Sequence, residues 1–339
     1  MGLGIFLYKF LFLAQNKEKK ESEMCTAIGF GGRFFCRTLD YESDFGAEII
    51  ISPEGCVDLC ERKNVYKILG IGVDAHGVPL YFDGVNECGL AMAGLNFPHF
   101  AKYNVGGEGN ATCGSGQLIS LILGSCRNVE EAREVLHSLR ITDDNPSCFG
   151  SSPLHWMLYD KNSCIVVEPL AGGLSICDNP VCVMTNSPEF SYHLRRLADF
   201  RSLTAGGSAD NLCSGKLLQY SRGMGAIGLP GDFSSVSRFV RAVFLRENIR
   251  YVSGDTMDGI TAGHRMLNAL SVPRGCVRSE RGEPVSTVYS CVADLEDVSY
   301  YVSTYRCQRL CRVNLAEHTT GKALKKYALP KKEDVLIPE

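Results

Sequence analysis

This sequence has no large excess of charge of either sign. Its 339 residues include 35 Lys and Arg against 38 Asp and Glu, a formal net charge of −3 at pH 7, and no basic stripe stands out. Domains that bind nucleic acid rely on a clustered positive face. The charge balance therefore predicts no nucleic-acid partner and favours a small-molecule substrate over a polyanion.

The sequence also lacks a hydrophobic run long enough to cross a bilayer. Its N-terminal apolar stretch, residues 3–14, is broken by Lys9 and followed by the charged residues 16–23. A membrane-spanning helix needs about 20 apolar residues. The stretch has neither the basic start nor the small-residue cleavage site of a secretory signal. We expect a cytoplasmic protein without stable membrane insertion.

The cysteines lack the regular spacing of a disulfide framework. There are 16, scattered along the chain, and the two Cys-x3-Cys pairs, 56/60 and 307/311, have no companion histidines at zinc-site spacing. Such thiols are typical of a reducing compartment, where many are buried as small hydrophobic side chains. We expect no bound metal and no other cofactor.

No linker, repeat or low-complexity segment divides residues 25–320. With 45% hydrophobic and 22% charged residues, the composition is that of a folded protein with a large core. The sequence predicts one domain over residues 25–339, preceded by an extension, residues 1–24, that does not belong to the fold.

Strand patterns and helix patterns occur in separate blocks. Segregated blocks favour an α+β fold, in which antiparallel sheets are covered by helices. A Gly-Gly hairpin at 31–32 and a turn over 84–89 join some of the strands. The expected strands are 26–30, 33–39, 47–52, 78–82, 90–95, 155–159, 164–168, 174–177, 181–185, 286–293, 298–304 and 310–315. The expected helices are 117–126, 128–139, 190–203, 234–248 and 258–270.

The dipeptide Met24-Cys25 is the first sign of chemistry. If Met24 is an initiator and is removed, Cys25 carries its thiol and a free α-amine on one residue. The α-amine titrates at about 7.7–8.0, so it can take the proton of the thiol. Three interpretations of residues 1–24 stay open, of which we favour the first: an over-called gene start, a removable pro-segment, or a weak membrane-associating tail.

Arg37 and Asp40 lie on or just past the strand that the Gly-Gly hairpin folds back beside Cys25. Arg37 can lower the pKa of the thiol, and Asp40 can hold and orient the α-ammonium. The alternatives are non-catalytic. Most cysteines are buried and inert, and an Arg–Asp pair is often a surface contact that contributes little to stability. These three residues alone do not decide between the two interpretations.

Seven segments together resemble one family, the choloylglycine hydrolases, which comprise bile salt hydrolases and penicillin V acylases. The first opens with Cys-Thr and ends in Arg-Thr-Leu-Asp, where the family usually has Gly-Arg-Asn before its last two residues. The resemblance runs from Met24 to about residue 315 in the family's order. Its segments are 24–40, 86–98, 153–157, 178–188, 228–239, 287–291 and 300–305.

The resemblance implies an N-terminal-nucleophile hydrolase fold, a four-layer αββα sandwich of two antiparallel sheets flanked by helices. Family relatives are often homotetramers, which makes a homo-oligomer the expected assembly. The catalytic residues it implies are the nucleophile Cys25, the neighbouring Arg37 and Asp40, the oxyanion-hole residue Asn96, a second asparagine Asn186, and Arg238.

Two asparagines have a competing interpretation. Asn96 and Asn186 both stand two residues before a proline, a position typical of turns. By the family resemblance, Asn96 favours bile salts, because some penicillin V acylases have tyrosine there. A rough alignment adds Leu39, Phe82 and Phe149 as candidates for an apolar substrate pocket. His155 and Trp156 are interpreted as core residues of a strand.

The resemblance predicts hydrolysis of the amide bond of glycine- or taurine-conjugated bile salts through a thioester on Cys25. The first alternative keeps that mechanism with another acyl group, as in a penicillin V acylase or an N-acyl homoserine lactone acylase. The second belongs to another class: a non-catalytic, thiol-rich binding protein in which Cys25 stays internal.

Overall fold

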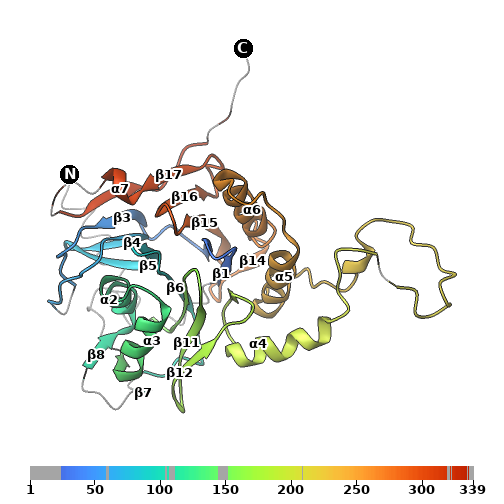
Figure 1. Cartoon of the computed structure of the whole chain (residues 1–339), viewed down its shortest axis with the longest axis horizontal. Helices are drawn as coiled ribbons and strands as arrows, with labels where there is room; N and C mark the ends of the chain where they lie inside the picture. Colours follow the sequence, from blue (N-terminus) through green and yellow to red (C-terminus); the bar gives the residue numbers. More distant parts are fainter. Residues whose placement is uncertain are drawn as a thin grey trace.

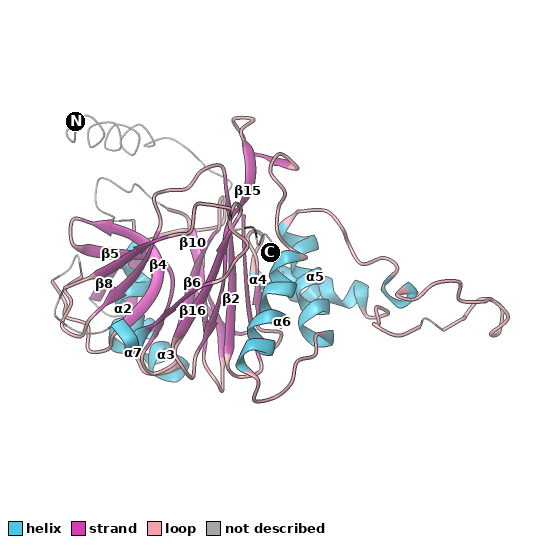
Figure 2. Cartoon of the chain, turned by 90° about the horizontal axis from the view of Figure 1, so that it is seen from above, coloured by secondary structure: helices cyan, strands magenta, loops and turns pink. Residues whose placement is uncertain are grey.

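The computed structural model describes residues 24–58, 61–103, 105–106, 111–143, 152–207, 209–318, 321, 323–333 and 335. Within them, the strands form two large antiparallel sheets and one small three-stranded sheet. The large sheets pack face to face, and helices cover the outer face of each (Figures 1 and 2). The expected four-layer αββα arrangement is confirmed.

The first large sheet carries the N-terminal hairpin. Its order among the described residues is β13-β1-β2-β15-β16-β17, with β14 beside β15. These strands are β1 Met24–Phe30, β2 Phe34–Tyr41, β13 Val183–Met184, β14 Val277–Arg278, β15 Pro284–Asp294, β16 Ser299–Thr304 and β17 Cys311–Asn314. The helices on its outer side are α4 Phe190–Arg196, α5 Ser235–Asn248 and α6 Thr256–Asn268.

The second large sheet has the order β12-β11-β10-β6-β5-β4-β3-β18 among the described residues. Its strands are β3 Glu48–Ser52, β4 Ile68–Ala75, β5 Val78–Asn86, β6 Ala91–Asn96, β10 Leu154–Tyr159, β11 Cys164–Leu170, β12 Gly173–Asp178 and β18 Lys325–Ala328. Helices α2 Leu118–Ser125 and α3 Val129–Ser138 cover its outer face.

Shorter elements complete the described chain. The small sheet contains β7 Val105–Gly106, β8 Ala111–Gly114 and β9 Leu139–Thr142. The 3₁₀ turns are η1 Ser115–Gln117, η2 Leu197–Phe200 and η3 Met224–Ala226, and α7 spans Leu315–His318.

Local signals account for where several helices begin. The side chain of Asn128 accepts a hydrogen bond of 2.9 Å from the backbone N–H of Glu131, as an N-cap of α3 does. Ser234 caps α5 through the N–H of Ser237 in the same way. Four of the five expected helices are found with ends shifted by one or two residues. The fifth, expected over 190–203, is α-helical only to Arg196 and continues as η2 to Phe200.

The sequence analysis did not predict six strands of the described residues, β4, β7, β8, β9, β14 and β18, and it misplaced one turn. No strand was expected at Ile68–Ala75, where β4 lies in the middle of the second sheet, and the turn expected over 84–89 begins late because β5 continues to Asn86. A Cβ atom on Gly70 would lie 2.3 Å from the carbonyl oxygen of Asp83. The glycines of β4 therefore permit close approach of β5, although glycine weakens the local strand signal.

Strand alternation divides the core into layers. In β10, Trp156 and Leu158 pack toward α2 and α3, whereas Met157 and Tyr159 pack into the core that the two sheets share. Trp156 is fully buried, as expected of a core residue. The shared core is also where the side chain of Cys25 lies.

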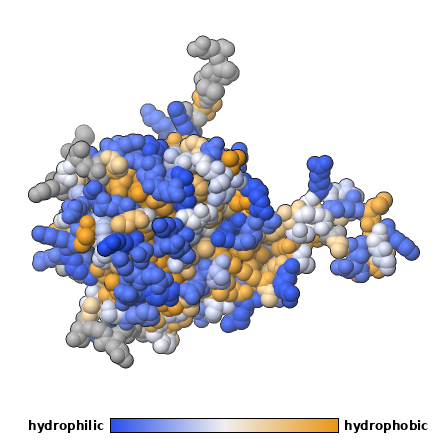
Figure 3. All heavy atoms as spheres, viewed as in Figure 1, coloured by the Kyte–Doolittle hydropathy of each residue, from blue (hydrophilic) through white to orange (hydrophobic). Residues whose placement is uncertain are grey.

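The described residues 201–207 and 209–233, which we call the arm, leave the body between η2 and α5 and project away from it (Figures 1 and 2). Hydrophobic side chains lie among the polar ones along the arm (Figure 3). Leu212, Leu218 and Tyr220 are almost completely exposed on it. Among the helices of the described residues, none has both the length and the hydropathy to span a membrane.

Candidate active site

Cys25 lies in β1, directly opposite Leu39 of β2. Three residues, Gly31, Gly32 and Arg33, separate the paired Phe30 and Phe34, and this turn sets the register. Gly31 and Gly32 have φ of +65° and +64°, left-handed values that glycine adopts without strain. Side chains alternate along a strand, so Cys25 and Arg37 share the face that meets the second sheet. The predicted hairpin is confirmed, and it places both side chains in one layer.

Arg37 connects the thiol of Cys25 to the second sheet. Its Nη2 donates to the Cys25 Sγ at 3.5 Å and to the carbonyl oxygen of Gly94 at 2.8 Å. Its Nη1 donates to Asp83 at 3.2 Å and to the hydroxyl of Tyr289. Burial opposes the charge, but the surrounding groups, Tyr289 foremost, raise the pKa of Arg37 overall. A fixed cation therefore lies beside the thiol.

Asp83 is a site residue that the sequence analysis missed. Its fully buried carboxylate accepts from Arg37, from the hydroxyls of Tyr289 and Tyr300, and from the thiol of Cys291. Burial raises the pKa of Asp83, against the lowering effect of Arg37 and these donors. The available signal was a carboxylate inside an apolar run, because aspartate is rarely buried without a partner.

Asn186 fixes the backbone of Cys25. Its Oδ1 accepts from the backbone nitrogen of Cys25 at 2.8 Å and from Nη2 of Arg238 at 2.7 Å. Its Nδ2 donates to the carbonyl oxygen of Asn96 at 2.9 Å. One side-chain amide, that of Asn186, thus joins the end of β6 to β1, and Asn96 takes part through its backbone carbonyl oxygen.

Arg238, in α5, reaches β1 from the side opposite the second sheet. Nη1 donates to the carbonyl oxygen of Cys25 at 2.6 Å and to Oγ1 of Thr26 at 2.7 Å, and Nε donates to the carbonyl oxygen of Phe233 at 3.0 Å. The guanidinium is completely buried, which lowers the pKa of Arg238. It holds Cys25 from the helical layer, as Arg37 does from the shared core.

Asp40 lies opposite Met24 in the hairpin. It accepts from Thr287 at 2.5 Å and from Thr38 at 3.4 Å, and it is fully buried. Burial raises the pKa of Asp40, whereas the charge of Arg238 acts to lower it. An α-ammonium formed at the next residue of β1 would supply the cation that this carboxyl is placed to meet.

The structure brings five of the six predicted catalytic residues into one hydrogen-bond network. These are Cys25, Arg37, Asn96, Asn186 and Arg238. Asp40 joins them through its electrostatic interaction with Arg238.

Of the pocket candidates, Leu39 is buried opposite Cys25. Phe82 is partly buried and lies edge-on to Phe45, with the ring centroids 5.9 Å apart. Phe149 lies outside the described residues.

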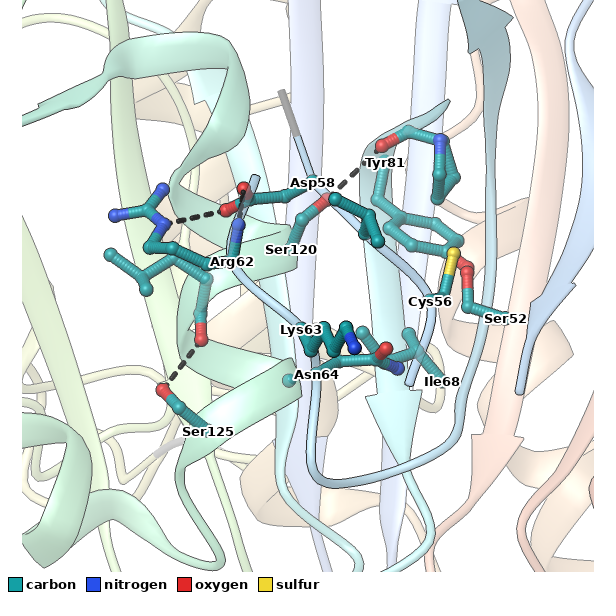
Figure 4. A pocket seen from close by; sticks show the side chains of 14 residues that line it. Ser52, Cys56, Asp58, Arg62, Lys63, Asn64, Ile68, Tyr81, Ser120 and Ser125 are labelled. Atoms are coloured by element: carbon teal, nitrogen blue, oxygen red, sulfur yellow. Dashed lines mark hydrogen bonds and ion pairs between the residues drawn. The ribbon is translucent and has the colours of Figure 1, made fainter. Parts of the chain in front are cut away.

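A pocket is found elsewhere, between α2 and the second sheet (Figure 4). Tyr81, Ser120 and Arg62 are among its lining residues, and none of the residues of the Cys25 network lines it. In the part of the chain that the structure describes, no group of three or more His, Cys, Asp or Glu side chains is arranged to hold a metal ion.

The network suits nucleophilic chemistry. A buried thiol has a guanidinium at 3.5 Å, the backbone nitrogen of the same residue is held by the amide oxygen of Asn186, and Nδ2 of that amide donates to the carbonyl oxygen of Asn96. A buried nucleophile with a fixed cation and a neutral amide close to it suits acyl transfer.

The sequence matches one family over most of its length. The profile described as "Linear amide C-N hydrolases, choloylglycine hydrolase family" covers residues 25–326. A bile salt hydrolase/transferase from Lactiplantibacillus plantarum is 37% identical over 318 residues, which cover 90% of this chain and 97% of the relative. A conjugated bile acid hydrolase from Lactobacillus acidophilus is 31% identical over 311 residues, covering 87% and 97% of the two chains.

Solved structures agree. A mutant of the conjugated bile acid hydrolase from Clostridium perfringens superposes with a TM-score of 0.84 at 29% identity, covering 94% of this chain and 100% of the other. Penicillin V acylase from Agrobacterium tumefaciens has a TM-score of 0.67 at 22% identity and 90% coverage of both chains, a similarity of fold alone.

Proposed function

Because this chain belongs to the choloylglycine hydrolase family of linear amide C–N hydrolases, we propose that it hydrolyses glycine- or taurine-conjugated bile salts. The observation that carries the proposal is the buried thiol of Cys25 with Arg37 at 3.5 Å and its backbone nitrogen held by Asn186. Membership of an enzyme family excludes the alternative of a non-catalytic thiol-rich binding protein.

The active form begins at Cys25. Absence or removal of residues 1–24 frees the α-amine at the point where Asn186 Oδ1 lies 2.8 Å from the Cys25 nitrogen. Asp40, opposite Met24, then faces the new ammonium and balances its charge. An N-terminal amine can serve as general base only when it carries no acyl group, so a longer chain is inactive.

In acylation, the Sγ of Cys25 attacks the amide carbonyl of the substrate while its proton passes to the α-amine. Arg37 stabilises the thiolate as it forms. The oxyanion of the tetrahedral intermediate accepts from Asn96 and from the second N–H of Asn186 Nδ2, whose first N–H is held by Asn96. Each fixed donor of this kind is worth about 3–4 kcal/mol of barrier.

Collapse of the intermediate breaks the C–N bond. The α-ammonium gives its proton to the departing nitrogen, which leaves as glycine or taurine, and a thioester remains on Cys25. Water then attacks the thioester carbonyl while the α-amine takes a proton from it. The free bile acid departs and the thiol regains its proton. Arg238 keeps the carbonyl and the amine of Cys25 in place throughout.

The rival substrate is penicillin V or another N-acylated amide cleaved by the same steps. Asn96 favours the bile salt, because some penicillin V acylases have tyrosine at the matching position. The first two relatives described above both carry names that refer to bile salts or conjugated bile acids, at 37% and 31% identity. Leu39 and Phe82 are the described candidates for contact with the apolar sterol.

The oligomer expected from the family is a homotetramer. The arm supports this part of the proposal, because it leaves Leu212, Leu218 and Tyr220 exposed to water. Large hydrophobic side chains gathered on a projecting segment are typical of interaction sites. Sedimentation analysis of the purified protein tests it: a monomer at micromolar concentration would contradict it.

The test of the main proposal couples two measurements on one sample. N-terminal sequencing and intact mass define the first residue, and parallel assays follow glycine or taurine release from conjugated bile salts and phenoxyacetate release from penicillin V. We expect Cys25 at the N-terminus and release from the bile salts. Turnover of penicillin V alone would overturn the proposed bile salt substrate. Activity in a chain that still begins at Met1 would overturn the proposal that the active form begins at Cys25.

Two cysteine substitutions, one in the network and one outside it, test the role of the Cys25 thiol. Cys25→Ser is expected to abolish turnover while the thermal unfolding midpoint stays near that of the parent. Cys88→Ser, at an exposed thiol outside the network, is expected to leave turnover unchanged.

A further inference from the structure

His155 is a buried side chain that touches the segments of both site asparagines. It lies in β10 opposite Leu95, and only 1% of its surface is exposed. Its Nε2 lies 2.8 Å from the carbonyl oxygen of Thr185, the residue before Asn186. Its ring stacks on Phe97, with centroids 4.2 Å apart and planes 7° apart. Neither contact is needed merely to fill a core position.

Glu168 orients this imidazole from β11. Its Oε1 lies 3.1 Å from Nδ1 of His155 and accepts a hydrogen bond of 3.0 Å from the backbone N–H of Phe190. Glu168 is itself buried. A carboxylate behind an imidazole fixes both the ring orientation and the nitrogen that carries hydrogen.

The nature of its hydrogen-bond partner shows that Nε2 of His155 carries a hydrogen. The carbonyl oxygen of Thr185 only accepts, so Nε2 of His155 must carry a hydrogen and donate it. Nδ1 and Glu168 then share one proton between them, whichever of the two atoms holds it. His155 therefore always presents an N–H to the backbone that precedes Asn186.

The next carbonyl of the same segment is held from another side. The carbonyl oxygen of Asn186 accepts from Nε2 of His193 at 2.9 Å and from Oγ of Ser235 at 2.8 Å, and Ser235 Oγ accepts from the N–H of Asn186 at 2.9 Å. Thr185 and Asn186 are thus fixed at consecutive peptide groups. The freedom left to the Asn186 amide is its side-chain torsions, and the hydrogen bonds to Cys25 and Arg238 set those.

We propose that His155, oriented by Glu168, is a positioning residue for catalysis that holds the Thr185–Asn186 backbone so that the Asn186 amide meets Cys25. The inference rests on the proposed role of Asn186 in amide hydrolysis. It replaces the interpretation of His155 as a plain core residue. Loss of the Thr185 hydrogen bond lowers kcat by about tenfold to a hundredfold, since small misplacements of catalytic groups have effects of that size, and it leaves KM nearly unchanged.

Two substitutions at His155 separate the hydrogen bond from the ring. His155→Phe keeps an aromatic ring against Phe97 and removes the donor, whereas His155→Gln loses the ring and places an amide N–H near the position of Nε2. We expect the loss of kcat in His155→Phe and recovery of most of it in His155→Gln. The reverse order, or a kcat within twofold of the parent for His155→Phe, would overturn the proposal.

The matched control is His264→Phe. His264, in α6, is also a buried histidine whose Nε2 lies 3.1 Å from a backbone carbonyl oxygen, that of Tyr301, and it is not part of the site. It should lower the unfolding midpoint as His155→Phe does while keeping the parental kcat. Equal losses of kcat in the two variants would show a structural role only and would overturn the proposal.

A second position keeps the test decisive if His155→Phe does not fold. Glu168→Ala leaves the imidazole unoriented and is expected to lower kcat at unchanged KM; parental kcat in that variant would overturn the proposal. All variants are assayed on conjugated bile salts and on penicillin V. If the parent cleaves only penicillin V, the proposed substrate fails, while the positioning role is still read from the amide that the parent does cleave.

Discussion

Arg37 and Asp83 form a buried ion pair that joins the two large sheets, with 3.2 Å between Nη1 and Oδ2. Their side chains are 2% and 0% exposed, so water does not screen the pair. The other terminal nitrogen of Arg37 donates to the thiol of Cys25. The geometry of the nucleophile therefore depends on a carboxylate that does not touch it.

The first prediction concerns Asp83→Asn. Removing the charge leaves Arg37 buried without its counter-ion, which is expected to lower the free energy of unfolding by about 3–5 kcal/mol. It also lowers kcat, because Nη2 of Arg37 is no longer held against Cys25. Urea unfolding followed by fluorescence and steady-state kinetics measure the two effects.

An exposed ion pair provides the comparison. Arg312 and Asp297 lie 3.1 Å apart, with side chains 38% and 48% exposed. Asp297→Asn should lower the free energy of unfolding by less than about 1 kcal/mol and leave kcat unchanged. If both variants lost the same stability, burial of the Arg37–Asp83 pair would not be what makes it strong.

The second prediction is that Arg238→Lys lowers kcat by roughly a hundredfold. The guanidinium serves four acceptors at once, on Cys25, Thr26, Asn186 and Phe233, and a single ammonium cannot reproduce its planar fork. Single-turnover kinetics should show the loss in both acylation and deacylation, because Arg238 holds the backbone used in each step.

Arg241→Lys is the control on the same helix. Arg241 is also largely buried, but its Nη1 donates to the carbonyl oxygens of Pro230 and Asp232, away from the Cys25 network. Arg241→Lys is expected to change the free energy of unfolding and to leave kcat at the parental value. Loss of kcat in both variants would assign the effect to helix α5 as a whole.

Much of the site could be predicted from the sequence because one hairpin encodes it. The turn of Gly31, Gly32 and Arg33 sets the register, and the register places Arg37 on the face of Cys25. Asp83 was not predicted as a site residue, because its strand β5 pairs with β4, and the glycines of β4 weaken the strand pattern there. The hydrogen bond between Asn186 and Cys25 joins residues 161 positions apart, so no local pattern reports it.

The third prediction tests how closely α6 packs on the first sheet. A Cβ atom on Gly259 would lie 2.3 Å from the ring of Phe34. Gly259→Ala is therefore expected to lower the free energy of unfolding by about 1–3 kcal/mol through overpacking, although alanine has the higher helix propensity by about 1 kcal/mol. Thr261→Ala, on the exposed side of α6, should change stability by less than about 0.5 kcal/mol. A more stable Gly259→Ala protein would contradict the close approach.

The fourth prediction concerns stability in acid. Burial lowers the pKa of His193 to about 4 and that of His264 to about 4, against 6.5 for an ordinary histidine. Between these values the unfolded chain binds a proton at each position that the folded chain does not bind. Each histidine thus contributes stability that is complete above pH 6.5 and is lost as the pH falls toward 4, about 3 kcal/mol over the whole range.

The measurement compares the parent with His193→Gln and His264→Phe in urea at pH 7 and pH 5. Carboxyl groups titrate alike in all three proteins, so the difference between variant and parent isolates the histidine. Between these two pH values, each variant should lose about 2 kcal/mol less free energy of unfolding than the parent, since the unfolded histidine gains its proton below pH 6.5. A parental pH dependence in His193→Gln would mean that His193 takes up its proton in the folded protein as readily as in the unfolded chain, which would contradict the effect of its burial.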